Sequence, residues 1–387
     1  MRVALITTDN REPFRKYDLD EPWLSPPIAA LVEGFQSAEI STEIQIHVLS
    51  CTQRIMRSPE KLAPNVCFHS LHVPKIGWLR TGYQGCIRAV RRKLRALRPD
   101  LVHGQGTERD CSISAVFSGF PNVVTIHGNM AELARLFKAP IGGFHWLAAR
   151  LENFTLRRTA GVFCNSAYTE ALVRPRTRRV WRVPNALQRA FFDPAPEAAA
   201  GFRRCVLLNV GVITPRKRQL ELLEVAQALH QRGLKFEFHF IGRINPAEAY
   251  AAAFLERLKP LEAAGCARHL GERPTEELIR HFDAASGLVH FPSEEAFGLV
   301  AAEALARDLK FFGARLGGII DIAEGVPGAE LFAGNDWAGL TDAIARWIEQ
   351  GHPKADGAAA LMRQRYHPEV VAQRHLEIYH EVLSARS

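Results

Sequence analysis

The sequence predicts two doubly wound α/β domains, each a parallel sheet covered by helices on both faces. Short apolar runs alternate with helical stretches almost throughout the 387 residues, and such alternation is typical of parallel sheets. This length suits two domains. A segment rich in proline and alanine, from Pro184 to about Arg203, separates the two sets of strands.

We therefore place a first domain at residues 1–190, a second at 203–365 and a terminal helix at 366–387. The terminal segment is expected to be helical because its apolar residues recur near helical spacing. The expected strands are Val3–Thr7, Ile44–Leu49, Leu101–His103, Val123–His127, Gly161–Asn165 and Val180–Val183 in the first domain, and Val206–Val212, Phe236–Ile241, Gly287–Phe291 and Lys310–Gly313 in the second.

Composition narrows the class of protein. No apolar run approaches the ~18 residues that a bilayer-spanning helix needs. The first apolar run, Val3–Thr7, is too short for a signal peptide. The seven cysteines are scattered, odd in number and without a C-x-x-C pair, which argues against a disulfide framework or a zinc site and favours a reducing compartment. We expect a cytoplasmic protein.

Positive charge is concentrated in the first half of the chain. Residues 1–200 hold 27 Lys and Arg against 17 Asp and Glu, whereas residues 201–387 hold 22 against 24. A basic half favours an anionic partner. Nucleic acid is not expected, because no nucleic-acid-binding motif or aromatic interleaving accompanies the charge.

A basic amphipathic helix is expected at residues 88–98, with apolar residues on one face and cations on the other. Its basic face is either simply solvated or in contact with anionic lipid headgroups. The second interpretation would place the protein peripherally at the inner face of the membrane and would suit a lipid-linked acceptor.

The most informative stretch runs from an apolar strand, Gly287–Phe291, into a helix expected from Phe297 onward. A helix N-terminus attracts anions such as phosphate, and Gly298 allows a ligand to approach the backbone closely. Glu295 in the loop and Glu303 on the helix would repel a phosphate, but they can accept hydrogen bonds from hydroxyls. A ligand with both phosphates and hydroxyls is a nucleotide sugar.

A second stretch carries three consecutive cations, Arg216, Lys217 and Arg218, shortly after an expected strand ends at Gly211. Cations are unfavourable where a helix begins, so this run predicts a bound anion such as a nucleotide diphosphate. The alternative is a solvated basic turn.

Together these features resemble the retaining glycosyltransferases of family four, which have the GT-B fold. The pair Glu295 and Glu303 matches their E-x7-E signature, Lys217 matches their phosphate-binding lysine, and His127 follows a strand as their His-Gly pair does. The resemblance implies two Rossmann-like domains facing a cleft, with the C-terminal helix crossing back to the first domain. It implies transfer of a hexose-type sugar from a nucleotide sugar to an acceptor hydroxyl, in cell-envelope, exopolysaccharide or glycolipid synthesis.

The resemblance also implies roles for individual residues. Lys217, with Arg216, would offset charge on the leaving diphosphate, Glu295 would hold sugar hydroxyls and Glu303 the ribose hydroxyls. His127 would approach the sugar from the other domain. The catalytic residues are then His127, Lys217 and Glu295, and the donor-binding residues are Gly211, Arg216, Lys217, Gly242, Gly271, Glu295, Phe297, Gly298, Leu299 and Glu303.

Some positions depart from the family pattern. Val212 stands where an arginine is usual, and Ala186 stands where a glycine is usual. The loop at residues 8–25 lacks the common Gly-Gly pair, and residues 307–310 lack the usual Gly-x-Pro. Two alternatives therefore stay open: a nucleotide-sugar 2-epimerase of the same architecture, and a non-catalytic scaffold with a degenerate donor site.

No metal or other cofactor is expected, because cations and helix N–H groups would neutralise the diphosphate. Asp18 and Asp20 imitate the Asp-x-Asp metal motif of another glycosyltransferase architecture, but the motif is short and does not follow a suitable strand.

Overall fold

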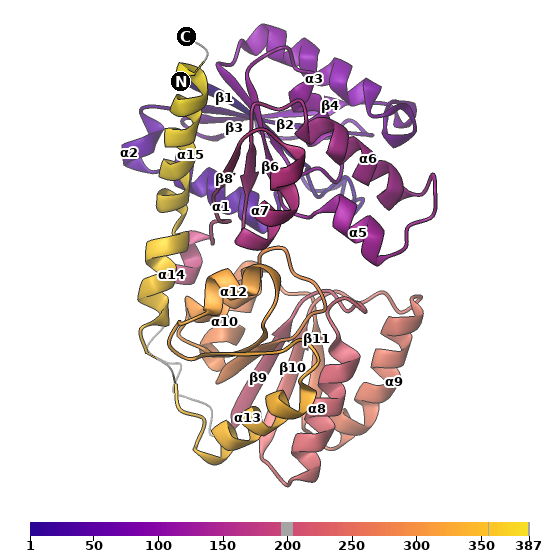
Figure 1. Cartoon of the computed structure of the whole chain (residues 1–387), viewed down its shortest axis with the longest axis vertical. Coiled ribbons are helices and arrows are strands. Elements are labelled where there is room, and N and C mark those ends of the chain that lie inside the picture. The colour runs from indigo at the N-terminus through magenta and orange to yellow at the C-terminus, as the bar shows by residue number, and fades with distance from the viewer. Residues whose placement is uncertain (195–203, 355, 386–387) are drawn as a thin grey trace. The chain divides into compact units, whose positions relative to one another are not determined.

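A computed structural model describes residues 1–194, 204–354 and 356–385. It divides the chain into two compact units, Met1–Gln188 with Tyr366–Ser387, and Arg189–Arg365 (Figure 1). Phe191, just after the division, contributes its ring to the second unit, 6.0 Å from the ring of Phe282. Much of the expected linker lies outside the described residues, including Pro196 and the Ala198–Gly201 run.

The first unit is built on an eight-stranded sheet in the order β3-β4-β2-β1-β5-β6-β7-β8. All neighbours are parallel except β3 and β4. Sequence analysis missed β3 and β4, because polar residues interrupt the apolar pattern of β4. The strands are β1 (Arg2–Ile6), β2 (Gln45–Thr52), β3 (Lys61–Ala63), β4 (Val66–His72), β5 (Leu101–Gln105), β6 (Asn122–Ile126), β7 (Val162–Cys164) and β8 (Val180–Arg182).

Helices connect most of these strands, as expected for parallel neighbours, whereas β2 leads to its parallel neighbour β4 through the short strand β3. The first helix begins with Pro26 and Pro27, which suit a first helical turn because its N–H groups have no partner within the helix. The helices of this unit are α1 (Pro26–Phe35), α2 (Ala38–Ser41), α3 (Gln84–Leu97), α4 (Cys111–Val116), α5 (Met130–Leu136), α6 (Phe144–Leu156), α7 (Ala167–Val173) and α15 (Pro368–Ser384).

The C-terminal helix α15 belongs to the first unit, as expected. Its residues Leu376 and Tyr379 are buried in the same apolar core as strand β1. It packs closely on α1 (Figure 1), where a side chain at Gly34 would put its Cβ 2.2 Å from the carbonyl oxygen of Pro368. The expected helix at 366–387 starts later, because Pro368 cannot continue the preceding helix and instead begins a new one.

The second unit has a six-stranded parallel sheet in the order β11-β10-β9-β12-β13-β14. Strand order reverses between β9 and β12, and ligands of such sheets bind beyond the carboxyl ends of strands at this reversal. Sequence analysis missed β11 and β14. The strands are β9 (Cys205–Val210), β10 (Phe236–Ile241), β11 (Ala267–Gly271), β12 (Gly287–His290), β13 (Lys310–Ala314) and β14 (Ala329–Phe332).

Helices cover this sheet, and the buried residues of α8 and α13 join its strands in one apolar core. The helices of the second unit are α8 (Gln219–Gln231), α9 (Ala249–Ala263), α10 (Thr275–Ala284), α11 (Leu299–Leu305), α12 (Gly317–Ala323), α13 (Trp337–Glu349) and α14 (Ala358–Tyr366). None of the helices that the structure describes combines the length and apolar character that crossing a membrane requires.

Candidate functional site

The loops after β9 and β12 meet at the reversal of strand order in the second unit. Lys217 Nζ donates to Glu295 Oε2 at 2.5 Å, and Arg216 donates to Glu294 Oε2 at 3.1 Å. The N–H of Ser293 donates to the carbonyl oxygen of Arg216 at 2.8 Å. The structure therefore brings together the two stretches that sequence analysis singled out separately.

The three consecutive cations already have partners within the chain. Lys217 and Arg216 pair with glutamates, and Arg218 donates to the carbonyl oxygen of Gly334. Helix α8 begins only at Gln219, so the cations precede it. The basic run therefore does not need a bound anion for its own stability. Lys217 nevertheless has three N–H donors, and its bond to Glu295 uses one of them.

Glu295 lies between two positively polarised groups. Burial by itself would raise the pKa of Glu295, but attraction to Lys217 and a hydrogen bond from His290 outweigh burial and hold this pKa well below its usual range. His290 Nε2 lies 3.1 Å from Glu295 Oε2. Sequence analysis missed His290, although a histidine at the carboxyl end of a strand was a usable signal. Glu295 is thus an ionised acceptor held in place from two sides.

Glu303 differs from Glu295 because no cation compensates it. Helix α11 begins at Leu299 rather than at Phe297, so Glu303 lies about one turn into the helix. Its side chain is buried, and among the described residues it forms no ion pair or hydrogen bond. Burial raises the pKa of Glu303 to about 8. A buried carboxyl without a protein partner is poised for a ligand that supplies hydroxyl donors.

Gly298 shapes the start of α11. It adopts a left-handed conformation with φ of 100° directly before the helix, which favours glycine. The N–H groups of Gly298 and Leu299 donate to no acceptor in the described part of the chain. Phe297 is buried beside them. The turn therefore offers backbone donors at the carboxyl end of the sheet.

Three glycines mark the same edge of the sheet. Gly211 and Gly242 follow β9 and β10, and Gly271 ends β11. The N–H of Gly211 donates to the carbonyl oxygen of Ile241 at 2.8 Å, and that of Gly242 donates to Gly271 at 2.9 Å. These bonds tie neighbouring loops together along the edge where Lys217 lies. Val212, which replaces the usual arginine, is exposed.

His127 occupies the corresponding edge of the sheet in the first unit, directly after β6. Its Nε2 lies 3.0 Å from Oε1 of Gln105, which ends β5. Its Nδ1 is buried and has no hydrogen-bond partner among the described residues. Burial lowers the pKa of His127 to about 4, and the side chain of Asn185 offsets part of that shift. The imidazole is therefore neutral near pH 7, with Nδ1 as an acceptor when Nε2 donates to Gln105.

A network of polar side chains lies behind His127. Gln105 Nε2 lies 3.4 Å from both nitrogens of His103. His103 is fully buried, with Nδ1 2.7 Å from the hydroxyl of Tyr379 and Nε2 2.7 Å from that of Thr125. His103 thus has a structural role, and α15 helps to support the strand that ends beside His127.

Two glutamates near His127 were not predicted. Glu108 Oε1 accepts from the N–H of Gly128 at 3.0 Å, and burial raises the pKa of Glu108 to about 7. Glu152 accepts from Met130 N–H at 2.8 Å and pairs with Arg176 at 2.7 Å. Glu108 could have been noticed because it closely follows an expected strand. Glu152 gave no such signal within its helix.

Asp18 and Asp20 are exposed. They join no cluster of three potential metal ligands within the ranges that the structure covers. Their loop is instead anchored by Arg11, a fully buried residue that pairs with Asp9 at 2.7 Å and donates to the carbonyl oxygens of Leu19 and Asp20. This loop is thus held by a guanidinium group where glycines are usual in the family.

The expected basic helix is α3. Its buried face includes Val90 and Leu94, as the sequence pattern predicts. Its exposed arginines form no ion pair with any described residue. They are Arg88, Arg91, Arg92 and Arg95, followed by Arg98 at the end of the helix.

Comparison with known proteins finds a curated relative and several solved structures that are similar to this chain. The D-inositol 3-phosphate glycosyltransferase of Acidothermus cellulolyticus is 26% identical over 221 residues, which are 54% of this chain and 49% of that relative. This chain therefore matches about half the length of that curated relative. Sucrose-phosphate synthase from Thermosynechococcus elongatus superposes with a TM-score of 0.78 at 16% identity, covering 100% of both chains. Anabaena HepE in complex with UDP-glucose superposes with a TM-score of 0.69 at 15% identity, covering 98% of this chain and 100% of that one.

These structural similarities establish a GT-B fold of two Rossmann-like domains. The family model Glycosyltransferase Family 4 matches residues 37–189, and the model Glycosyl transferases group 1 matches residues 201–361. Between them the two models span most of the sequence, and the chain belongs to the GT-B glycosyltransferases of the family 4 type.

Proposed function

We propose that this glycosyltransferase transfers a hexose-type sugar from a nucleotide sugar to an acceptor hydroxyl, with retention of anomeric configuration and without a metal ion. The observation that carries the proposal is the meeting of Lys217 and Glu295, 2.5 Å apart, at the reversal of strand order in the second unit. A cation and an ionised acceptor side by side suit a ligand that is both a diphosphate and a sugar. The structural neighbour bound to UDP-glucose supports a nucleotide sugar as donor.

In this proposal the donor's parts are recognised by different groups. Lys217 uses its remaining N–H donors for the diphosphate, together with the unpaired N–H groups of Gly298 and Leu299. Glu295 accepts hydrogen bonds from sugar hydroxyls. Glu303, which has no partner in the described chain, accepts from the ribose hydroxyls. Each group is then matched by opposite polarity in the ligand.

Catalysis follows from where charge develops. As the bond to the sugar breaks, negative charge grows on the leaving diphosphate and positive charge on the sugar ring. Lys217 and the backbone donors stabilise the negative charge on the diphosphate. Ionised Glu295, near the sugar hydroxyls, stabilises the positive charge on the sugar ring. His127 is neutral, so its Nδ1, which has no hydrogen-bond partner among the described residues, can accept a hydrogen bond from a substrate hydroxyl without adding positive charge.

A thermal-shift screen of the full chain against UDP-, GDP- and ADP-sugars tests the proposal. We expect the sugars of one of these nucleotides to raise the melting temperature of the wild type. The same sugars should not raise the melting temperature of Glu303→Ala. Nuclear magnetic resonance of the product formed with an acceptor then reports the anomeric configuration. No shift with any donor would overturn the proposal in favour of a non-catalytic scaffold. Conversion of the donor without an acceptor would indicate the 2-epimerase.

The acceptor is proposed to lie at an anionic membrane surface and to be lipid-linked. The observation is the row of exposed, unpaired arginines on α3 and at its end, which favours anionic headgroups by about 1 kcal/mol for each cation near the surface. Sedimentation with vesicles of phosphatidylglycerol, against phosphatidylcholine, tests this. Replacing Arg88, Arg91 and Arg92 by Ser should abolish binding to the anionic vesicles, and unchanged binding would contradict this role.

A further inference from the structure

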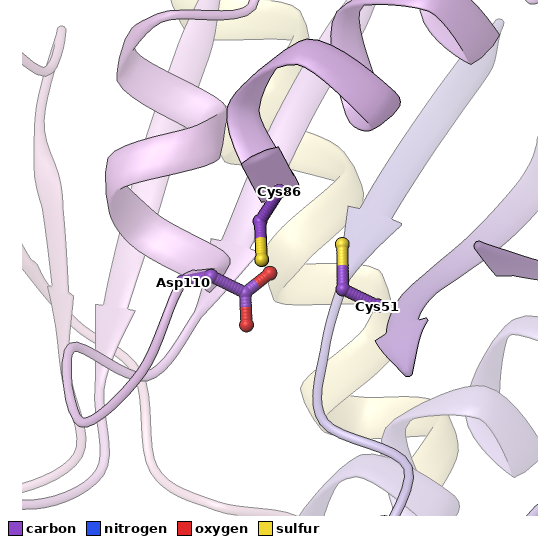
Figure 2. A group of neighbouring side chains, drawn as sticks. All are labelled: Cys51, Cys86 and Asp110. Atoms are coloured by element: carbon purple, nitrogen blue, oxygen red, sulfur yellow. The ribbon is translucent and has the colours of Figure 1, made fainter. Parts of the chain in front are cut away.

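Three potential metal ligands meet in the core of the first unit (Figure 2). They are Cys51 near the end of β2, Cys86 in the first turn of α3, and Asp110 directly before α4. Their sulfur and oxygen atoms all lie within 4.8 Å of one another. Their exposed fractions are 5%, 0% and 3% respectively. Residues far apart in the sequence thus converge on one buried point.

Burial raises the pKa of the Asp110 carboxyl, and its surroundings compensate this burial only in part. Arg109 attracts the carboxylate, and the Cys51 thiol and the N–H of Asp110 itself donate to it, but burial outweighs all three. Asp110 occupies the capping position of α4, but its side chain makes no capping hydrogen bond. It forms no ion pair with any described residue. Its neighbour Arg109 stacks on the ring of Trp78, 4.9 Å from the ring centre. Figure 2 shows the carboxylate directed toward the two thiols instead. A buried carboxylate is costly unless a cation or hydrogen-bond donors compensate it.

We propose that Cys51, Cys86 and Asp110 bind a divalent metal ion of the zinc class. Two thiolates and one carboxylate oxygen are ligands that Zn²⁺ accepts readily. Around a tetrahedral zinc, sulfur and oxygen ligands lie about 3–4 Å apart, and the separations in this cluster are compatible with that value.

Binding balances in charge and protons. The two thiols lose their protons to solvent as the metal–sulfur bonds form, so two thiolates and one carboxylate face one divalent cation. The three ligands carry one negative charge more than the divalent cation balances. This charge lies beside Arg109, which directly precedes Asp110 in the chain. With three protein ligands, a water molecule would take the fourth coordination position, which differs from the four protein ligands usual in structural zinc sites.

The site would have a structural role. It would connect β2, α3 and the loop after β5, and so fix the helix that carries the exposed arginines. None of its ligands is a residue that we assign to sugar transfer, so the proposal does not depend on the proposed function. The even burial of all three groups also fits a metal that is incorporated during folding.

Metal analysis of the full-length protein tests the site. After removal of loosely bound metal by a brief chelator wash, we expect about one zinc per wild-type chain by mass spectrometry. Cys51→Ser, Cys86→Ser and Asp110→Asn should each lower the zinc content by at least about tenfold. Cys111→Ser is the matched control, because Cys111 is buried next to Asp110 but its Sγ contacts Thr8 Oγ1 at 3.7 Å. It should keep its zinc.

A second measurement needs only the wild type, in case the ligand variants fail to fold. Protein grown with Co²⁺ should show thiolate-to-cobalt charge-transfer absorption, and a mercurial reagent that blocks thiols should release the metal. A wild-type chain that is folded but metal-free, and that stays metal-free after refolding with Zn²⁺, would overturn the proposal. A Cys51–Cys86 disulfide found by mass spectrometry in the freshly isolated protein would overturn it as well.

Discussion

The two sheets end in edges of opposite electrostatic character. In the second unit the edge is charged by the ion pair of Lys217 and Glu295. Glu303 is buried with no cation partner among the described residues, and its pKa of about 8 keeps it mainly protonated near pH 7. In the first unit the edge beside His127 is largely neutral. Burial lowers the pKa of His127 to about 4, so its imidazole is uncharged at neutral pH, and raises the pKa of Glu108 to about 7, so this carboxyl is only about half ionised there.

This difference fits our proposal that the two edges bind different parts of the substrates. Parallel strands deliver loop residues to the carboxyl edge in both units, so the backbone alone does not set their function. A charged edge suits phosphates and the hydroxyls next to them. A neutral edge rich in hydrogen-bonding groups suits uncharged hydroxyls, because it can accept or donate without a strong field. Substitutions at each edge should therefore have different effects on turnover and on its pH dependence.

The largest effect is expected at the charged edge. Replacing Lys217 by Ala should lower turnover by about 10²–10³-fold, because it removes a donor to the developing charge on the diphosphate. Steady-state kinetics with the donor found in the screen would measure this. Lys310→Ala is the matched control. Lys310 is also paired with a glutamate, Glu330, but it lies at the amino end of β13, away from the carboxyl edge of the sheet. Wild-type turnover in Lys217→Ala would refute the role.

At the neutral edge, His127→Ala should lower kcat by about 10²-fold. Gln105→Leu should have a smaller effect, because it removes only the bond that sets the orientation of the ring. Since the pKa of His127 is about 4, the imidazole is neutral above that pH and protonates only below it. The pH–rate profile should therefore show no loss from His127 between pH 5 and 8. A limb near pH 6.5 that disappears in His127→Ala would contradict the neutral edge.

Donor affinity should depend on Glu303 and on pH. Donor hydroxyls favour the ionised carboxylate and should lower the pKa of Glu303 from about 8. Binding then releases a proton, so affinity should rise with pH until about 8 and remain constant above it. Glu303→Gln should weaken donor binding by about tenfold at pH 8 and lose this pH dependence. Calorimetry in two buffers of different ionisation enthalpy would detect the proton, and its absence would remove the ribose role.

The same carboxyl predicts a smaller effect on stability. The pKa of Glu303 rises from 4.5 to about 8 in the folded chain. Its contribution is therefore fully present below pH 4.5 and is lost as pH rises through about 8. Glu303→Gln should raise the melting temperature relative to wild type at pH 9 but not at pH 4. Equal differences at both pH values would show that Glu303 is not buried as an acid.

The smallest effect is expected from chelation. Brief treatment with EDTA should leave turnover unchanged, because in our proposal Lys217 and backbone donors take the place of a metal at the donor diphosphate. Prolonged treatment with EDTA under partly denaturing conditions is a separate test. It would remove a metal ion from the buried cluster of Cys51, Cys86 and Asp110, and its effect would be on the stability of the fold. Immediate loss of turnover that Mn²⁺ restores would overturn metal independence.

Much of the fold follows from local patterns in the sequence. Apolar runs between helical stretches predicted ten strands in two sets, and the apolar spacing of the last segment predicted a helix near the C-terminus. Strands β4 and β14 escaped prediction, because their residues mix polar and apolar character and gain their order from neighbouring strands. Strands of this kind depend on pairing more than on propensity.

The sequence by itself predicted which loops carry chemistry, and this stays a prediction: the residues after Gly211, those around Glu295 and Glu303, and His127. Only the tertiary structure determined which charged side chains pair with each other. It paired Lys217 with Glu295, placed His290 beside that glutamate, and left Glu303 buried without a partner. It also gathered Cys51, Cys86 and Asp110 into one cluster, although the spacing of the cysteines in the sequence argued against a zinc site. The reason is physical: strand and helix patterns are local, whereas charge pairing and burial depend on which distant loops the order of strands brings to one edge.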